Sequence, residues 1–150
     1  MLLMEEFLRL LDKNLRLVSF EYKNDVLIIQ CETVRAEKPC PYCGTASDKA
    51  HSRYVRKIKD LPFGEFKVVL MVAANKYFCQ GGECGKKTFS ERLLFLQPFS
   101  RMTKRLNNFV LENAISTNAM SAEKFIRKNT AQLSDTTINR IIKKNAQNNR

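Results

Sequence analysis

Cys40-Pro41-Tyr42-Cys43 decides the fold of this chain together with a second stretch, Cys79-Gln80-Gly81-Gly82-Glu83-Cys84. A thiolate pair separated by about two to four residues can hold one face of a zinc ion, and a second pair from a distant turn completes a closed tetrahedron. Because such a site has no open coordination position, it stabilises structure and does not catalyse a reaction. The sequence therefore predicts a structural Zn²⁺ ion held by Cys40, Cys43, Cys79 and Cys84.

Glycines accompany both cysteine pairs. Gly44 follows the first pair and permits the positive φ that tight metal-binding turns often adopt. Gly81, Gly82 and Gly85 are expected to give the same freedom to the longer second loop. About 35 residues separate the two pairs, more than the simplest four-cysteine pattern contains, and an intervening β-hairpin accounts for the excess.

The cysteines and the single histidine also allow other interpretations. A C-x-x-C pair can cycle between dithiol and disulfide, but this leaves the second pair unexplained, and no thioredoxin-like βαβ pattern surrounds the first. Cys31 lies inside an apolar strand pattern and is interpreted as a buried small hydrophobe rather than a fifth ligand. His51 is interpreted as a surface or hydrogen-bonding residue, with replacement of one cysteine ligand as the alternative.

Size and composition suit a small protein that uses a metal to supplement its core. The chain has 150 residues, of which 44% are hydrophobic and 27% charged, as in ordinary globular proteins. No run approaches the roughly 18 apolar residues of a membrane span. The N-terminus lacks the basic region and cleavage site of a secretory signal, so five reduced cysteines in a cytoplasmic protein are expected.

The first part of the chain alternates helical and strand patterns. Apolar residues recur at helical spacing over residues 1–15 and predict an amphipathic helix. Residues 26–34 follow an Asn-Asp turn and predict a strand, as do residues 53–59, which a turn at residues 60–64 closes. Residues 66–78 are apolar on both faces and predict an inner strand, covered on each side, that leads directly into Cys79.

Helical periodicity replaces strand patterns after Pro98. One helix is expected to end near Thr117. A second runs over residues 121–128, with Ser121 as its N-cap and with Phe125 and Ile126 facing inward.

A third helix is expected to begin after Ser134 as N-cap, with Leu133 stapled onto Ile138. Ile138, Ile141 and Ile142 then share one face of this helix. The opposite face is polar and basic, with Thr136, Asn139, Arg140 and Lys143. Together with the second helix and a short link over residues 129–133, this is a helix-turn-helix pattern whose last helix could read a DNA major groove.

Net charge is +11 and is unevenly distributed along the chain. Residues 1–39 carry six basic and seven acidic side chains, residues 40–100 carry ten and five, and residues 101–150 carry ten and three. A cationic surface of this kind attracts phosphate polyanions by releasing their counterions, which makes nucleic acid the leading partner. The alternative is a basic but inert solvated surface.

Taken together, the motifs resemble the N-terminal half of bacterial insertion-sequence transposases of the ISL-three family. The resemblance covers residues 35–145 and rests on CPYCG at 40–44, HSRYVRKIKDLP at 51–62, KYFC at 76–79, CGKKTFSERL at 84–93, RMTKRL at 101–106 and TTINRIIKK at 136–144. It implies a zinc ribbon followed by a helix-turn-helix that binds the terminal inverted repeats of a mobile element, with the four paired cysteines as metal ligands. Family members continue into a catalytic domain with three acidic residues, which is expected to be missing from a chain that stops at Arg150.

We therefore predict an α+β protein with two domains. Residues 1–98 are expected to hold the N-terminal helix and a small antiparallel β zinc ribbon, and residues 99–150 a three-helix helix-turn-helix domain. The expected function is sequence-specific binding of double-stranded DNA by a transposase module without catalytic activity, associated with the nucleoid of a bacterial cytoplasm. The predicted DNA contacts are Thr136, Thr137, Asn139, Arg140, Lys143 and Lys144, with Arg53, Arg56, Lys57 and Lys59 extending the basic track.

Two other functions remain open from the sequence. The chain could be an interaction protein that pairs with full-length transposase, or with a second copy of itself, through residues 1–15 and the ribbon. An enzyme would require a cluster of metal-binding carboxylates. The 15 acidic residues are scattered along the chain, which disfavours the enzyme.

Overall fold

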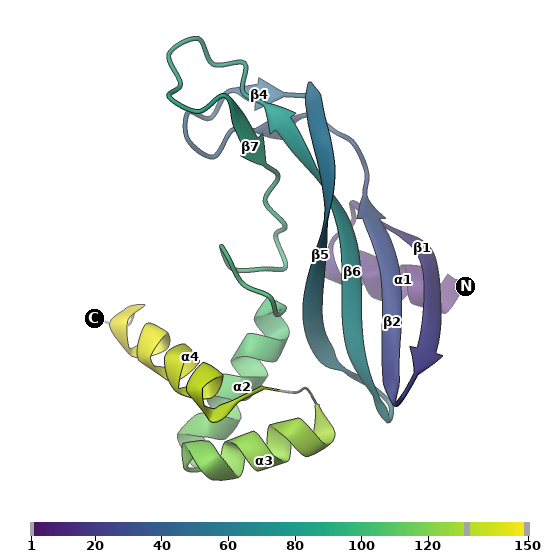
Figure 1. The fold of residues 1–150 in the computed structure, drawn as a ribbon, viewed down its shortest axis with the longest axis vertical. Helices are drawn as coiled ribbons and strands as arrows, with labels where there is room; N and C mark the ends of the chain where they lie inside the picture. The colour runs from purple at the N-terminus through teal and green to yellow at the C-terminus, as the bar shows by residue number, and fades with distance from the viewer. Residues whose placement is uncertain (1, 131–132, 149–150) are drawn as a thin grey trace.

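A mixed β-sheet is followed by a group of helices in the computed structural model of this protein, which describes residues 2–130 and 133–148 (Figure 1). The architecture is α+β, as predicted. In chain order the elements are α1 (Leu2–Leu11), β1 (Leu15–Lys23), β2 (Val26–Thr33), β3 (Lys38–Pro39), β4 (Ala46–Ser47), β5 (Ala50–Phe63), β6 (Phe66–Phe78), β7 (Thr88–Ser90), α2 (Lys104–Ser116), α3 (Ala119–Asn129) and α4 (Asp135–Asn148).

The main sheet has the strand order β1-β2-β6-β5, and β7 pairs with the end of β6. Strands β2 and β6 are parallel, whereas the other neighbours are antiparallel. The sheet is therefore larger than the predicted antiparallel ribbon, and it is mixed. The predicted strand over residues 66–78 is confirmed as β6, an inner strand that ends immediately before Cys79.

Strand β5 is longer than predicted, and the expected turn over residues 60–64 is wrong. The strand runs to Phe63, which pairs with Phe66, and the hairpin turn contains Gly64 at φ 59°. A register shift between Asp60 and Phe63 places Pro62 in a bulge on an edge strand, where a missing N–H breaks no ladder hydrogen bond. Asp60 and Pro62, which suggest a turn in the sequence, thus both lie within strand β5.

The predicted helix over residues 1–15 is also too long. Helix α1 ends at Leu11, a short turn follows, and Leu15 is the first residue of β1. In this turn the Asn14 backbone N–H donates to the Asp12 carboxylate at 2.9 Å. Leu15 fits the apolar spacing of the helix only by coincidence. It is buried, but it belongs to strand β1, which we did not predict.

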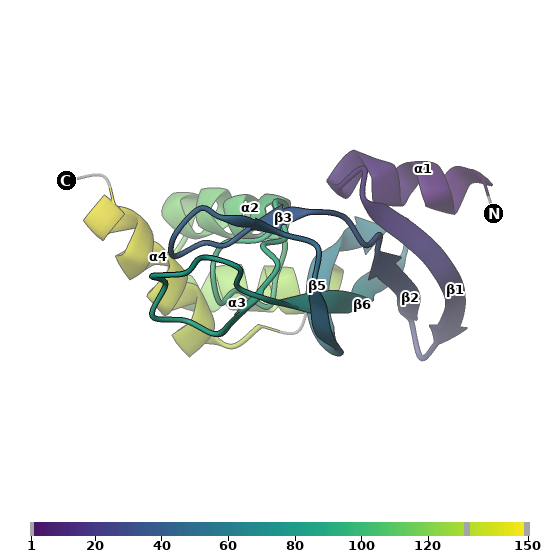
Figure 2. The same ribbon diagram turned by 90° about the horizontal axis from the view of Figure 1, so that it is seen from above.

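One face of the sheet carries the core. Helix α1 covers this face (Figure 2), and the chain after β7 adds apolar side chains to the same cluster. Its buried members are Met4, Leu8, Leu15, Leu27, Ile29, Cys31, Ile58, Val68, Leu70, Val72, Leu93, Phe95 and Leu96. On the other face of β6, the alternate residues 67–73 are only half-buried, so this part of the strand is covered on one side and not on both, as had been expected.

Helices α2, α3 and α4 pack against one another around a second apolar cluster. Thr103 caps α2, which ends at Ser116, close to the predicted end near Thr117. The cap of α3 is Asn118, not Ser121, because the Asn118 side chain accepts the Ser121 N–H at 2.8 Å. Phe125 is 48% exposed rather than inward-facing, whereas Ile126 is fully buried.

The start of α4 agrees with prediction. Ser134 accepts the Thr137 N–H at 3.3 Å, and Leu133 and Ile138 are buried in the same cluster. The predicted link over residues 129–133 includes residues 131–132, which lie outside the described residues.

The first turn of α2 is joined to β5 by polar contacts. Backbone hydrogen bonds run from Lys59 to the Arg101 carbonyl at 2.9 Å and from Thr103 to the Lys59 carbonyl at 3.0 Å. The fully buried Asp60 carboxylate accepts from the Thr103 hydroxyl at 2.6 Å and from Arg105 Nε at 2.8 Å. Residues on both sides of position 98 therefore share one hydrogen-bonded junction.

Candidate metal centre and basic surfaces

Four cysteine sulfurs lie close together. The segments that carry them adjoin β4, β6 and β7, and β4 and β7 lie at one end of the molecule (Figure 1). The Sγ atoms of Cys40, Cys43, Cys79 and Cys84 all lie within 4.8 Å of one another, and Cys43 Sγ is 3.5 Å from Cys79 Sγ. Thiolates around tetrahedral zinc, with Zn–S bonds of about 2.3 Å, are about 3.8 Å apart. A disulfide requires about 2.05 Å, so the arrangement matches a metal-binding tetrahedron and not a pair of disulfides.

The first knuckle lies between the short paired strands β3 and β4. The Cys40 N–H donates to the Thr45 carbonyl at 2.9 Å, and the Gly44 N–H donates to the Cys40 carbonyl at 2.8 Å. Gly44 has φ 76°, which confirms the conformation expected after Cys43. This hairpin fixes the distance between its two sulfurs.

The second knuckle follows β6 and returns to β7. The Cys79 N–H donates to the Lys87 carbonyl at 2.9 Å, and the Gly81 N–H donates to Cys79 Sγ at 3.4 Å. An N–H···S hydrogen bond favours a thiolate, which is the form that binds metal. The β5–β6 hairpin thus brings the second cysteine pair back beside the first, as the sequence predicted.

The environment of the four sulfurs suits a cation. Hydrogen bonds from the Thr45 side chain and backbone lower the pKa of Cys43 to about 6. The hydrogen bond from the Gly81 N–H acts to lower the pKa of Cys79. Burial and hydrogen bonds with the neighbouring cysteine thiols outweigh this effect and raise the pKa to about 12. Four thiolates so close together repel one another unless a divalent ion lies among them, so the donor set fits zinc.

Two residues weighed as further ligands lie elsewhere. Cys31 is buried in the main core on the face of Leu27 and Ile29, and burial raises the pKa of its thiol to about 12. The prediction of a buried hydrophobe is confirmed. His51 contacts the Ser52 hydroxyl through Nδ1 at 2.8 Å and the Phe78 ring edge-on, as expected of a hydrogen-bonding residue.

Gly81 is required for space rather than for a positive φ. A Cβ atom at this position would lie 2.8 Å from Cys43 Sγ and 3.1 Å from Thr45 Oγ1, whereas a Cβ at Gly82 would meet nothing within 4 Å. Neither glycine has a positive φ, so the backbone freedom expected for this loop is not used. Gly81 is needed because the Cys43 sulfur lies close to its Cα.

We expect Gly81→Ala to weaken zinc binding by at least about tenfold, because the methyl group displaces a ligand sulfur from its position. Competition with a chromogenic chelator measures this affinity. Gly82→Ala is the matched control and should bind zinc like the wild type. Equal zinc affinity in the two variants would contradict the described packing.

The predicted DNA-contacting residues of α4 share an exposed face. Thr136, Asn139, Arg140, Lys143 and Lys144 line an open surface hollow together with Gln147. Ile138 and Ile141 are buried on the other side of the helix, as predicted. Thr137 is half-buried and contacts the Ser134 hydroxyl at 3.1 Å, so it lies in the helix cap rather than on the hollow.

The predicted cations of β5 do not form one track. Arg53 and Lys57 project from the open face of the sheet, because they occupy alternate positions of the same strand. Arg56 projects to the opposite side and donates to the Ser100 carbonyl at 2.6 Å. Lys59 is half-buried beside the start of α2.

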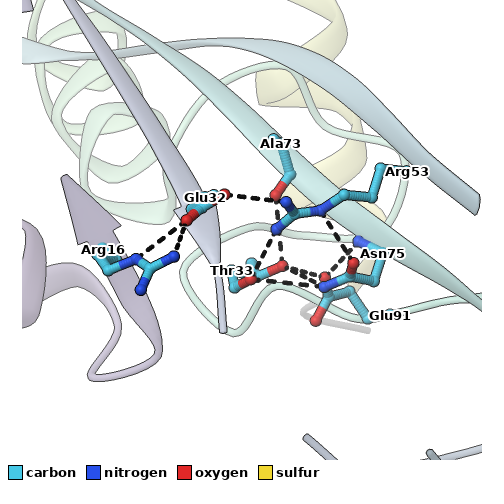
Figure 3. A network of polar contacts seen from close by, with 7 residues as sticks. All are labelled: Arg16, Glu32, Thr33, Arg53, Ala73, Asn75 and Glu91. Atoms are coloured by element: carbon cyan, nitrogen blue, oxygen red, sulfur yellow. Dashed lines mark hydrogen bonds and ion pairs between the residues drawn. The ribbon is translucent and has the colours of Figure 1, made fainter. Parts of the chain in front are cut away.

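A polar network that we did not predict surrounds Arg53 (Figure 3). Its guanidinium donates to Glu32 at 2.9 Å, to the Thr33 carbonyl at 3.2 Å and to Asn75 Oδ1 at 3.2 Å. The carboxylate of Glu91 is buried beneath, where it accepts from the Asn75 N–H at 2.5 Å and from the Thr33 hydroxyl. Sequence spacing gave no signal for these contacts, since they depend on the register of three strands.

None of the helices in the described residues is long and apolar enough to cross a membrane.

Comparison with known proteins places the cysteine-bearing segment in a recognised group. Residues 36–84 match the family described as the zinc-finger of transposase IS204/IS1001/IS1096/IS1165. The chain is also similar to the transposase for insertion sequence element IS1001 of Bordetella parapertussis, with 33% identity over 86 residues. This alignment covers 57% of the chain but 20% of that transposase. No solved structure matches. The family match and the sulfur geometry together identify the four cysteines as a structural zinc site.

Proposed function

We propose that this chain, whose residues 36–84 carry the zinc ribbon of ISL-three-type transposases, is a module that binds double-stranded DNA at the terminal inverted repeats of a mobile element. The single observation that carries the proposal is the exposed face of α4, where Arg140, Lys143 and Lys144 flank the short polar residues Thr136 and Asn139. Long cations reach phosphates or guanine, and short polar side chains approach base edges.

Helices α3 and α4 would act as a helix-turn-helix. The two helices contact each other and α2, and their shared apolar cluster holds α4 with its polar face outward. In this geometry the second helix enters the major groove and the first crosses the backbone. Arg127 and Lys128 lie exposed in the last turn of α3, where they would contact phosphates.

We assign residues 1–98 and 99–150 to different roles within this function. The zinc ion would fix the knuckles of the ribbon, and the helices of the second part would read DNA. The Asp60 junction supports a fixed orientation between the two parts, because a buried carboxylate on β5 holds the first turn of α2.

No catalytic step is assigned to this chain. Among the described residues, the four cysteines are the one group of His, Cys, Asp or Glu placed to hold a metal ion. Strand transfer by a two-metal mechanism needs convergent carboxylates, and the buried ones, Asp60 and Glu91, are engaged in structural contacts. The proposed activity is therefore binding.

Selection from a random duplex pool, followed by binding at several salt concentrations, tests the proposal. We expect affinity to fall steeply between about 50 and 200 mM salt, because several phosphates are neutralised. Arg140→Ala should weaken binding roughly tenfold or more, while Lys13→Ala, an exposed cation in the turn before β1, should not. Binding that is absent, or independent of salt and Arg140, would contradict the proposal.

Exposed leucines on α1 favour a second candidate function. Leu2, Leu3 and Leu10 are 79%, 86% and 82% exposed, respectively, and suit a contact with full-length transposase or a second copy of the chain. This interaction should form a mixed or self-associated oligomer and should not depend on Arg140. Arg140→Ala tested in both duplex binding and sedimentation with the partner separates the two functions.

A further inference from the structure

We propose that a small pocket on the open face of the sheet binds a backbone phosphate of nucleic acid. Its lining consists of Arg16, Thr33, Val34, Arg35 and Arg53, which come from three strands and from the chain just after β2. The pocket is separate from the hollow along α4, since the two share no residue. The inference rests on the proposed function for the identity of the ligand.

Strand register brings the three arginines together. Arg16 pairs with Glu32 across β1 and β2, so both side chains project from the same face of the sheet. Arg53 reaches the same carboxylate from β5, across β6, as Figure 3 shows. Arg35 follows the end of β2 directly and completes the lining.

Two of these guanidiniums are held in position. Arg53 makes three hydrogen bonds, to Glu32, Asn75 Oδ1 and the Thr33 carbonyl, and Arg16 Nε donates to Glu32 at 3.0 Å. A guanidinium has five N–H donors, so each side chain keeps donors outside these contacts. Because its rotamer is already fixed, Arg53 would lose little conformational entropy on binding an anion.

The local charge balance favours an anion. The Arg16 hydrogen bond, with a further one from Arg53, lowers the pKa of Glu32, which is therefore ionised at neutral pH. Glu91 lies beneath with its side chain buried, 4.0 Å from Lys38 Nζ. The cations of this region therefore outnumber its carboxylates by four to two: Arg16, Arg35, Arg53 and Lys38 against Glu32 and Glu91. Exposed Arg35 has no ion pair among the described residues.

Phosphate is the group that matches this set of donors. A tetrahedral phosphate presents several oxygens, which converging guanidiniums bind in bidentate fashion. The pocket is open to solvent and small, and three arginines line it. We infer that it fixes the ribbon on the DNA backbone while α4 contacts the bases, since phosphate contacts position a protein without specifying sequence.

The test measures duplex binding and its salt dependence for the full chain and single variants. Arg35→Ala and Arg16→Ala are each expected to weaken binding about threefold to tenfold and to lower the slope of log K against log salt by about 1. Glu32→Gln should strengthen binding, because the pocket then carries one more net positive charge. Lys23→Ala, an exposed cation at the other end of β1 from Arg16, is the matched control and should bind like the wild type.

Three results would decide the matter. Loss on Arg35→Ala with gain on Glu32→Gln supports the phosphate pocket. Wild-type affinity in the Arg35 and Arg16 variants, with weakened binding in Arg140→Ala, overturns the pocket and leaves the proposed function intact. If the wild type binds no duplex, a titration with inorganic phosphate followed through the amide signals of residues 33–35 replaces it: shifts abolished by Arg35→Ala keep the site as a free-phosphate site, and no shifts overturn it.

Discussion

Replacing Cys40 with serine should abolish stoichiometric zinc and unfold one end of the molecule. Cys40 is the most buried of the four ligands, at 1% exposure, and it packs with Tyr77 and Phe89. Structural zinc contributes about 10–16 kcal/mol to folding in small zinc-finger peptides. Here the main sheet has its own core, so we expect a smaller loss, at least about 3 kcal/mol, and a melting temperature lower by about 10 °C.

The unfolding should be local. Three of the four ligands, Cys40, Cys79 and Cys84, belong to a cluster with Tyr77 and Phe89 that is separate from the core under α1. In strong chelator, the amides of Cys40 and Cys79, which donate to Thr45 and Lys87, should lose hydrogen-exchange protection. Amides in the β2–β6 ladder should keep theirs.

Cys31→Ala is the matched control for this experiment. It removes a buried sulfur from the main core and should lower stability by an ordinary cavity effect, yet retain one zinc per chain. Metal content by mass spectrometry distinguishes the two variants. Two results would contradict the four-cysteine site: a Cys40→Ser protein that still binds one zinc ion, or wild-type protein whose hydrogen-exchange protection is unchanged in chelator.

The metal centre was predictable because its signal is local and chemical. Each cysteine pair lies within one turn, and the pattern of residues 66–78 predicted the strand that carries the second pair back to the first. The exposed face of α4 was predictable for a similar reason, since helical spacing alone separates Ile138 from Arg140. Both predictions needed only short stretches of chain.

Features that depend on strand register were not predictable. Leu15 was assigned to the helix predicted over residues 1–15, and no element was predicted for residues 16–23, so β1 was missed, and with it the pairing that places Arg16 beside Glu32. Asp60 suggested a turn because acidic residues are common in turns. Its role as a buried partner of Arg105 depends on where α2 places that arginine, 45 residues later in the chain.

Asp60→Asn should strongly destabilise the junction between β5 and α2. The change keeps the shape of the side chain but removes the charge that Arg105 Nε and Nη2 contact. Breaking a fully buried ion pair from one side costs about 3–5 kcal/mol. The Arg105 side chain is 35% exposed and also lies over the Phe7 ring at 4.9 Å, so we expect about 2–3 kcal/mol in urea unfolding.

The Asp60→Asn change should affect more than stability, because Asp60 also accepts a hydrogen bond from the hydroxyl of Thr103, the N-cap of α2. A loosened first turn frees the three helices from the sheet, so the proposed duplex binding should weaken even though none of the proposed DNA-contacting residues has changed. Glu65→Gln, an exposed acid in the hairpin turn of the same strand pair, is the matched control and should alter neither property. An Asp60→Asn protein with wild-type stability would show that the sheet and the helices are held together by their apolar contacts, including Leu61 against the helical cluster, and not by the buried carboxylate.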